Sequence, residues 1–232
     1  MFLSKKLIKE ITFSSFSFLF YFSLSYSYVL TNSFILNKIT INLLVWKYLR
    51  TVYRCELLTK IIAKVVFGGD GGVGKTTLIQ RYLTGEFIDT TKLTIGVGFH
   101  IHQMSYQERD ISLSVWDCGG QEQFKQMGIF DNYFRGALVA VLMFDLTRAL
   151  SVAGLETWYS FVDKHSKTSL ILVGGKSDLQ RDSLLSDDVV QETIQKYNAI
   201  RYIETSSANG LGVDLVFNEI ARLSLEKIPE DF

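Results

Sequence analysis

Apolar and polar positions follow a regular pattern only from residue 60 onward. Apolar runs rich in β-branched residues, some of them alternating with polar positions, predict strands at 60–68, 95–106, 111–117, 137–145, 169–174 and 201–205. Amphipathic stretches predict helices at 76–83, 151–162, 186–197 and 212–225. Strands that alternate with helices in this way predict an α/β fold, in which helices flank a mostly parallel, six-stranded sheet.

Residues 1–57 are interpreted as a separate extension, and residues 58–232 as the domain. Residues 11–30 are long and apolar enough to suggest a membrane segment, but six of these twenty residues are serine. The chain up to residue 60 also contains no Gly, Ala, Pro or Asp, which is typical of translated A/T-rich DNA. A misassigned start, with translation beginning near Leu57 or Leu58, is therefore favoured over a membrane anchor and over a cleaved signal peptide.

Charge and cysteine content narrow the classes of function. Residues 1–60 carry eight basic and two acidic residues, a net charge of +6, whereas residues 61–232 carry 16 basic and 22 acidic residues, a net charge of −6. The domain is therefore mildly acidic, without the broad basic face that binding to nucleic acid requires. Cys55 and Cys118 are too few for a disulfide framework or a structural zinc site. A reducing, cytoplasmic location is expected, with membrane association only if residues 11–30 are a true anchor.

The stretch GDGGVGKT at 69–76 carries candidate chemistry for binding phosphate. It follows a predicted strand and opens a predicted helix, which is the context that a nucleotide phosphate loop requires. Glycines let successive backbone N–H groups turn toward phosphate oxygens, and the positive end of the helix dipole adds to the attraction. In such a loop Lys75 would reach the β- and γ-phosphates and the Thr76 hydroxyl would bind Mg²⁺. The motif alone leaves GTP or ATP, and a switch or a nucleotide kinase, as open alternatives.

Two later stretches add groups that can act on the same phosphates. WDCGGQE ends the third predicted strand, where Asp117 can hold Mg²⁺ through a water and Gly120 can bring its N–H close to the γ-phosphate. Gln121 can orient an attacking water. Thr94 lies on a polar loop before the second predicted strand, where its hydroxyl can bind Mg²⁺ and its N–H the γ-phosphate. Phe87 can pack edge-on against a base.

Together with LVGGKSDL at 172–179 and ETSSA at 204–208, these motifs make residues 60–226 resemble the Ras superfamily of small GTPases. TIGVGF and YFRGALVAVLMFDLT are most similar to the Rab branch, although the subfamily is left open. The resemblance implies a P-loop NTPase with the small G-protein fold, a molecular switch that binds GTP and GDP with Mg²⁺ and hydrolyses GTP slowly. It also implies an effector, an exchange factor and a GTPase-activating protein as partners in trans.

The resemblance assigns roles to residues at the matching positions. Catalytic roles fall to Lys75, Thr94 and Gln121, and Mg²⁺ contacts to Thr76, Thr94 and Asp117. The expected nucleotide contacts are Gly71, Gly72, Val73, Gly74, Lys75, Thr76, Thr77, Phe87, Thr94, Gly120, Lys176, Asp178, Ser206, Ser207 and Ala208.

The expected base contacts depart from the family pattern at two positions. The resemblance implies that Asp178 accepts hydrogen bonds from guanine, that Lys176 lies over the ring and that the Ser207 N–H donates to O6. Gly175 replaces an asparagine that ties this loop to the phosphate loop, and Ala208 replaces a lysine that packs on the ring. Each lost contact is worth about 1–3 kcal/mol, which predicts faster nucleotide exchange with guanine selectivity retained. Asparagine restored at position 175 should then slow GDP release.

Three functions compete on this evidence. A GTP-hydrolysing switch is favoured by Gln121 and Thr94, whereas a hydrolysis-poor pseudo-GTPase that acts as an interaction module is favoured by Gly175 and Ala208. A nucleotide kinase or ATPase is disfavoured by GKSD and TIGVGF. The sequence contains no convincing built-in arginine finger, so fast turnover is expected to need a partner.

Overall fold

The computed structural model describes residues 61–88, 94–121, 130–165 and 167–228. Contacts within the chain divide it into Met1–Leu58 and Thr59–Phe232, and the described residues all belong to the second unit. The expected domain start at residue 58, the interpretation of residues 11–30 and Cys55 lie outside the described residues. Within the described ranges, no helix combines the length and apolar character needed to cross a bilayer.

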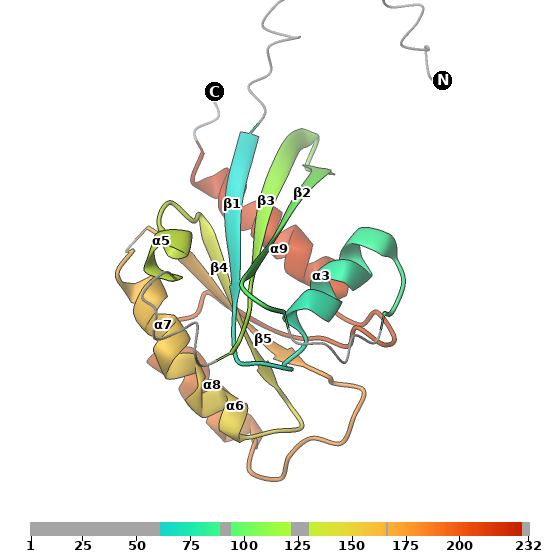
Figure 1. Ribbon diagram of the computed structural model, residues 1–232, viewed down its shortest axis with the longest axis vertical. Coiled ribbons are helices and arrows are strands. Elements are labelled where there is room, and N and C mark those ends of the chain that lie inside the picture. The colour runs from blue at the N-terminus through green and yellow to red at the C-terminus, as the bar shows by residue number, and fades with distance from the viewer. Residues whose placement is uncertain (1–60, 89–93, 122–129, 166, 229–232) are drawn as a thin grey trace, which may run out of the picture. The chain divides into compact units, whose positions relative to one another are not determined.

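Six strands form one sheet, as the alternating pattern predicts (Figure 1). Their bounds are β1 Ile61–Gly68, β2 Val97–Tyr106, β3 Arg109–Cys118, β4 Val139–Asp145, β5 Ser169–Gly175 and β6 Arg201–Glu204. The spatial order is β2-β3-β1-β4-β5-β6, and every neighbouring pair is parallel except the antiparallel hairpin β2/β3. Gln107 and Glu108 form the hairpin turn, and both have positive φ, as a two-residue turn that follows the strand twist requires.

Helices cover both faces of this sheet (Figure 1). Their bounds are α3 Lys75–Thr84, α5 Phe130–Phe134, α6 Leu150–Ala153, α7 Leu155–Asp163, α8 Asp187–Lys196 and α9 Val213–Glu226. Successive residues of a strand point to opposite faces, so β1 and β4 contribute side chains to two separate cores. One core packs against α3 and α9, and the other against α5, α7 and α8. The predicted fold class, a P-loop α/β domain with a mostly parallel six-stranded sheet, is confirmed.

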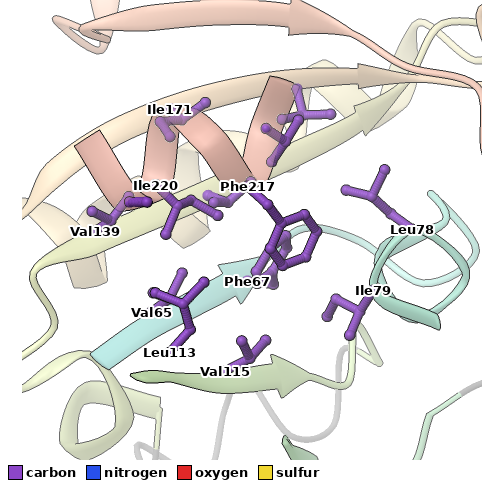
Figure 2. Close-up of a cluster of buried hydrophobic side chains, with 14 of the residues drawn as sticks. Val65, Phe67, Leu78, Ile79, Leu113, Val115, Val139, Ile171, Phe217 and Ile220 are labelled. Atoms are coloured by element: carbon purple, nitrogen blue, oxygen red, sulfur yellow. The ribbon is translucent and has the colours of Figure 1, made fainter. Parts of the chain in front are cut away.

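Aromatic stacking ties α9 to the strand that leads into the phosphate loop. Figure 2 shows Phe217 of α9 beside Ile220 and close to Phe67 of β1, with Ile79 of α3 on the opposite side from Ile220. The ring centroids of Phe217 and Phe67 are 5.9 Å apart, and the ring of Tyr82 stacks on the other side of Phe217. Both phenylalanines are fully buried. Through Tyr82 and Phe217, α3 and α9 thus pack together against the strand that leads into the phosphate loop.

Two details differ from the pattern-based prediction. The helix predicted at 151–162 is interrupted at Gly154, where a Cβ would lie 2.0 Å from the Asp70 carboxylate, so the phosphate loop approaches the helix pair through this gap. The short helix α5 was not predicted. Phe130 and Phe134, four positions apart on α5, are both buried against α7, and five residues are too few for a periodic signal.

We predict that Phe217→Ala lowers the free energy of unfolding by about 3–5 kcal/mol, because it leaves a cavity between β1, α3 and α9. Leu215→Ala on the same helix is the matched control, since Leu215 is 47% exposed. Its effect should stay within about 0.5 kcal/mol. Urea unfolding followed by circular dichroism measures both values, and equal losses for the two variants would contradict the packing described here.

Candidate functional site

The predicted motifs meet at one edge of the sheet, where the five parallel strands have their carboxyl ends. The phosphate loop follows β1, and Asp117 to Gln121 end and follow β3. Residues 175–178, called the base loop below, end and follow β5, and residues 205–208 follow β6. In an open α/β sheet this edge is the ordinary place for a ligand. The sheet thus brings together segments that lie more than a hundred residues apart in the chain.

The phosphate loop has a backbone path that only glycine adopts easily. Gly69, Gly72 and Gly74 have φ values of 143°, 76° and 106°, in the region that side chains disfavour. A Cβ on Gly69 would also lie 2.2 Å from the carbonyl oxygen of Met143 in β4. The loop therefore rests directly on the main chain of the neighbouring strand.

The end of this loop offers positive charge and backbone donors to an anion. Gly74 is the N-cap residue of α3 and supplies no side-chain cap, so the first N–H groups of the helix remain for a ligand. Lys75 is only 5% exposed, and its Nζ donates to the carbonyl oxygens of Gly69 (2.6 Å) and Asp70 (2.9 Å). The ammonium group thus lies across the mouth of the loop, as the motif predicts.

Of the three residues predicted to bind Mg²⁺, Thr76 is in direct contact with the other two. The Thr76 hydroxyl donates to Asp117 Oδ2 at 2.6 Å and lies 2.6 Å from the Thr94 hydroxyl. Because the single Thr76 proton is directed to Asp117, Thr94 is the donor in the second bond. These residues come from α3, the loop before β2 and the end of β3.

The environment of Asp117 fits a divalent cation. Asp117 is 1% exposed, and its Oδ1 has no hydrogen-bond partner within the described part of the chain. Burial raises the pKa of Asp117, against the opposing effects of the Thr76 hydrogen bond and the Lys75 charge. A hard cation would coordinate Asp117 Oδ1 and offset the free-energy cost of burying the negative charge. One carboxylate with two hydroxyls, completed by phosphate oxygens and water, suits Mg²⁺ better than a cage built of protein side chains alone.

The glycine pair after β3 packs against the phosphate loop. The Gly119 N–H donates to the Gly96 carbonyl oxygen at 2.8 Å. A Cβ on Gly120 would lie 2.3 Å from the main-chain nitrogen of Gly71 and the carbonyl carbon of Asp70. Gln121 is the next residue in the chain. The structure thus places Gly120 against the phosphate loop, while the predicted roles of Gly120 and Gln121 toward the γ-phosphate stay predictions.

Lys176 of the base loop is held to the end of β4. Its Nζ lies 2.6 Å from Asp145 Oδ2, while Thr147 donates to the other carboxylate oxygen through its N–H and hydroxyl. Burial raises the pKa of Asp145, but the hydrogen bonds from Lys176 and Thr147 outweigh it, so the net shift is downward. Lys176 also has φ 61°, a left-handed conformation that is rare for a residue with a long side chain. Such local strain is common at functional loops.

The base loop and the segment after β6 are joined through their main chains. The Ser177 N–H donates to the Thr205 carbonyl oxygen at 3.0 Å, which places Ser206 to Ala208 beside Lys176 and Asp178. Asp178 is exposed, so its carboxylate is accessible to a ligand. Phe87 is also exposed, in the segment after α3. The structure thus assembles the predicted base residues, while the predicted contact of Phe87 with a base stays a prediction.

Two contacts of the phosphate loop were missed by the sequence analysis. Arg148 Nη2, from the loop after β4, donates to the Gly71 carbonyl oxygen at 3.0 Å. The indole N–H of Trp158 donates to Asp70 Oδ1 at 3.3 Å. Both pairs are separated by more than 70 residues in the chain, and neither belongs to a local motif, so no local signal could have revealed them.

Comparisons with known proteins agree with this geometry. A model of the Ras family matches residues 64–226 of the chain. The Ras-related protein SEC4 of Candida albicans is 34% identical over 173 residues, which cover 74% of this chain and 81% of that protein. SEC4 of Saccharomyces cerevisiae is 33% identical over 169 residues, 72% of this chain and 77% of that protein. The Ras-related protein Rab-12 of Mus musculus is 32% identical over 170 residues, 72% and 69% of the two chains.

We predict that Gly120→Ala separates the segment after β3 from the phosphate loop, because the new Cβ would collide with main-chain atoms of Asp70 and Gly71. Amide hydrogen exchange in peptides from residues 69–76 and 117–121 should become roughly tenfold faster. Gly98→Ala on β2 is the control, since its Cβ would meet its nearest atom at an ordinary 3.4 Å. Unchanged exchange in Gly120→Ala would rule out the packing described.

Proposed function

Because this chain belongs to the Ras superfamily of small GTPases, we propose that the residues gathered at the carboxyl edge of its sheet bind GTP with Mg²⁺ and hydrolyse it. Family membership makes the protein a Rab-like, GTP-binding molecular switch with GTPase activity. The assignment of this activity to particular residues is the proposal. The observation that carries it is the meeting of Thr76, Thr94 and Asp117 at 2.6 Å, from three separate segments.

Phosphate binding falls to the loop between β1 and α3. The N–H groups from Gly71 to Thr77 line the loop and the first turn of α3, where the helix dipole favours negative charge. Lys75, now held by two loop carbonyl oxygens, is close enough to exchange these for β- and γ-phosphate oxygens. Its burial strengthens that attraction, because water screens the charge less.

Cation binding and hydrolysis fall to the segments around Thr94 and Gln121. The two threonine hydroxyls and Asp117 would hold Mg²⁺, which neutralises charge on the β- and γ-phosphates. Gln121 follows Gly120, which packs on the phosphate loop, so its amide is suited to orient a water toward the γ-phosphate. The guanidinium of Arg148 donates to the main-chain carbonyl oxygen of Gly71, so it is already engaged by the loop itself. We therefore expect fast turnover to require an activating partner.

Guanine recognition falls to Asp178, Lys176 and the main chain at Ser207. Asp178 is exposed at the site edge, and its carboxylate can accept from both the N1–H and the amine of guanine, a donor pair that adenine lacks. The stem of Lys176, anchored by Asp145, can lie along the ring. Selectivity for guanine should therefore survive without an asparagine at position 175.

The proposed partners are proteins that distinguish the GTP-bound from the GDP-bound state. An exchange factor, an activating protein and an effector would read the segments next to Thr94 and Gln121, since these contact the phosphate loop directly. Phe99 and Ile101 are exposed on β2, close after Thr94, which supports a protein contact there. A cytoplasmic location is proposed, with membrane association only if residues 11–30 are a true anchor.

We predict that Asp178→Ala weakens binding of GDP by roughly 10- to 100-fold, because it removes two hydrogen bonds to a charged acceptor. Binding of ATP, already weak, should not change. Asp188→Ala on α8 makes the same charge change at an exposed position away from the site and serves as the control. Titration of nucleotide-stripped protein with fluorescent GDP and ATP gives both affinities. An equal loss for the two nucleotides would refute the role of Asp178 as the guanine reader.

We predict that Gln121→Leu slows GTP hydrolysis by roughly tenfold or more, because the attacking water loses its orienting amide. Affinity for GTP should stay the same. Gln191→Leu, an exposed position on α8, is the matched control. Single-turnover release of phosphate measures the rate. Equal rates for wild type and Gln121→Leu would favour the alternative function, an interaction module that hydrolyses little.

A further inference from the structure

We propose that the thioether end of Met143 replaces the missing asparagine tie between the phosphate loop and the base loop, and thereby sets the rate of nucleotide release. This inference rests on the proposed function and names a positioning residue of the same site. Met143 lies near the end of β4, the strand that pairs with β5 and so lies next to the start of the base loop.

The space beside Gly175 is filled by Met143. A Cβ built on Gly175 would lie 2.4 Å from Met143 Cε, well inside the closest approach of two carbon atoms. It would also lie 3.0 Å from the carbonyl oxygen of Val73 in the phosphate loop. The position that an asparagine side chain would use to reach Val73 is therefore occupied by the methionine methyl group.

Met143 also contacts both ends of the phosphate loop. Its carbonyl oxygen lies against Gly69, where no Cβ could be accommodated, and its Cε lies 3.4 Å from a Cβ built on Gly74. The main chain of Met143 thus lies against the first turn of the loop, and its methyl group lies on the side of Gly74 and Gly175 where a Cβ would point. An asparagine would make this link through directional hydrogen bonds, whereas a thioether makes it through packing alone.

The methionine has little freedom to move aside. Met143 is 1% exposed and belongs to the core shared by α3 and α9. Its strand lies between β1 and β5, where it pairs in register with Val173. An added Cβ at position 175 must displace the methyl group, and the new position of this flexible side chain must fit a closely packed core.

Two consequences follow for the exchange of nucleotide. Release requires the phosphate loop and the base loop to separate, so loosening Met143 should speed release while Asp178 preserves guanine selectivity. The substitution Gly175→Asn, expected from the sequence to slow release, should fail by itself because the asparagine meets Met143. Gly175→Asn should slow the release of GDP only when Met143 is replaced by a shorter residue at the same time.

The test is a double-mutant cycle in the full chain loaded with fluorescent GDP and chased with excess GDP. Met143→Val, which removes the thioether end, should release GDP roughly three- to tenfold faster than wild type. The Gly175→Asn single variant should also release GDP faster than wild type. The double variant should release more slowly than either single variant, because the asparagine can then reach the Val73 carbonyl oxygen.

Three further variants separate positioning from general stability. Met143→Leu preserves volume and should stay close to the wild-type release rate. Gly175→Ala adds only the Cβ and should speed release, which keeps the proposal testable if Gly175→Asn fails to fold. Leu113→Val shortens a buried residue of the same core, in the middle of β3 and away from both loops. It should lower the melting temperature and leave the release rate unchanged.

Additive effects in the cycle, or a wild-type release rate in both Met143→Val and Gly175→Ala, would overturn the role of Met143. Those outcomes leave the proposed function standing, because wild-type protein would still bind GDP with Mg²⁺. Failure of wild-type protein to bind GDP would instead overturn the proposed function and the inference that rests on it. The two failures are therefore distinguishable in the same assay.

Discussion

The close approach of the phosphate loop to the main chains around it is the constraint on which the whole site depends. β1 lies in the middle of the sheet, so the loop that follows it is bordered by β3 on one side and β4 on the other. Side chains would block every one of these approaches. Cβ atoms would come within 3.0 Å of a neighbouring group at Gly69, Gly120, Gly154 and Gly175. The phosphate loop is therefore packed directly against Gly120, the second residue after β3.

Two buried aspartates at this edge show why a cation belongs on the β3 side. Asp117 near the end of β3 and Asp145 at the end of β4 lie on opposite sides of β1, and both side chains are buried. The negative charge of Asp145 is stabilised by hydrogen bonds from Lys176 and Thr147, which lower its pKa. Asp117 receives a hydroxyl proton on one oxygen only, and its pKa is raised because burial prevails. The uncompensated carboxylate lies beside the phosphate loop, where a divalent cation can serve the protein and the phosphates together.

Sequence reasoning succeeded where the physical signal is local. The glycines of residues 69–74 need positive φ, and the apolar runs need burial, so the path of the phosphate loop and all six strands could be predicted. Contacts between distant segments could not. Met143 reads as one more apolar residue in a buried strand, and nothing near it indicates that its methyl group faces Gly175. The interruption at Gly154 likewise depends on Asp70, which is 84 residues away.

The roles proposed for Asp178 and Met143 separate selectivity for the nucleotide from its retention. Asp178 reads the base from an exposed loop, so its contribution depends on hydrogen-bond geometry and little on core packing. Met143 holds that loop to the phosphate loop from within the core, where packing and not polarity determines the strength of the link. An asparagine would combine both roles in one side chain, because its amide can contact the base and the phosphate loop together. Dividing them lets the strength of the link change with one apolar residue, at no loss of the contacts that distinguish guanine from adenine.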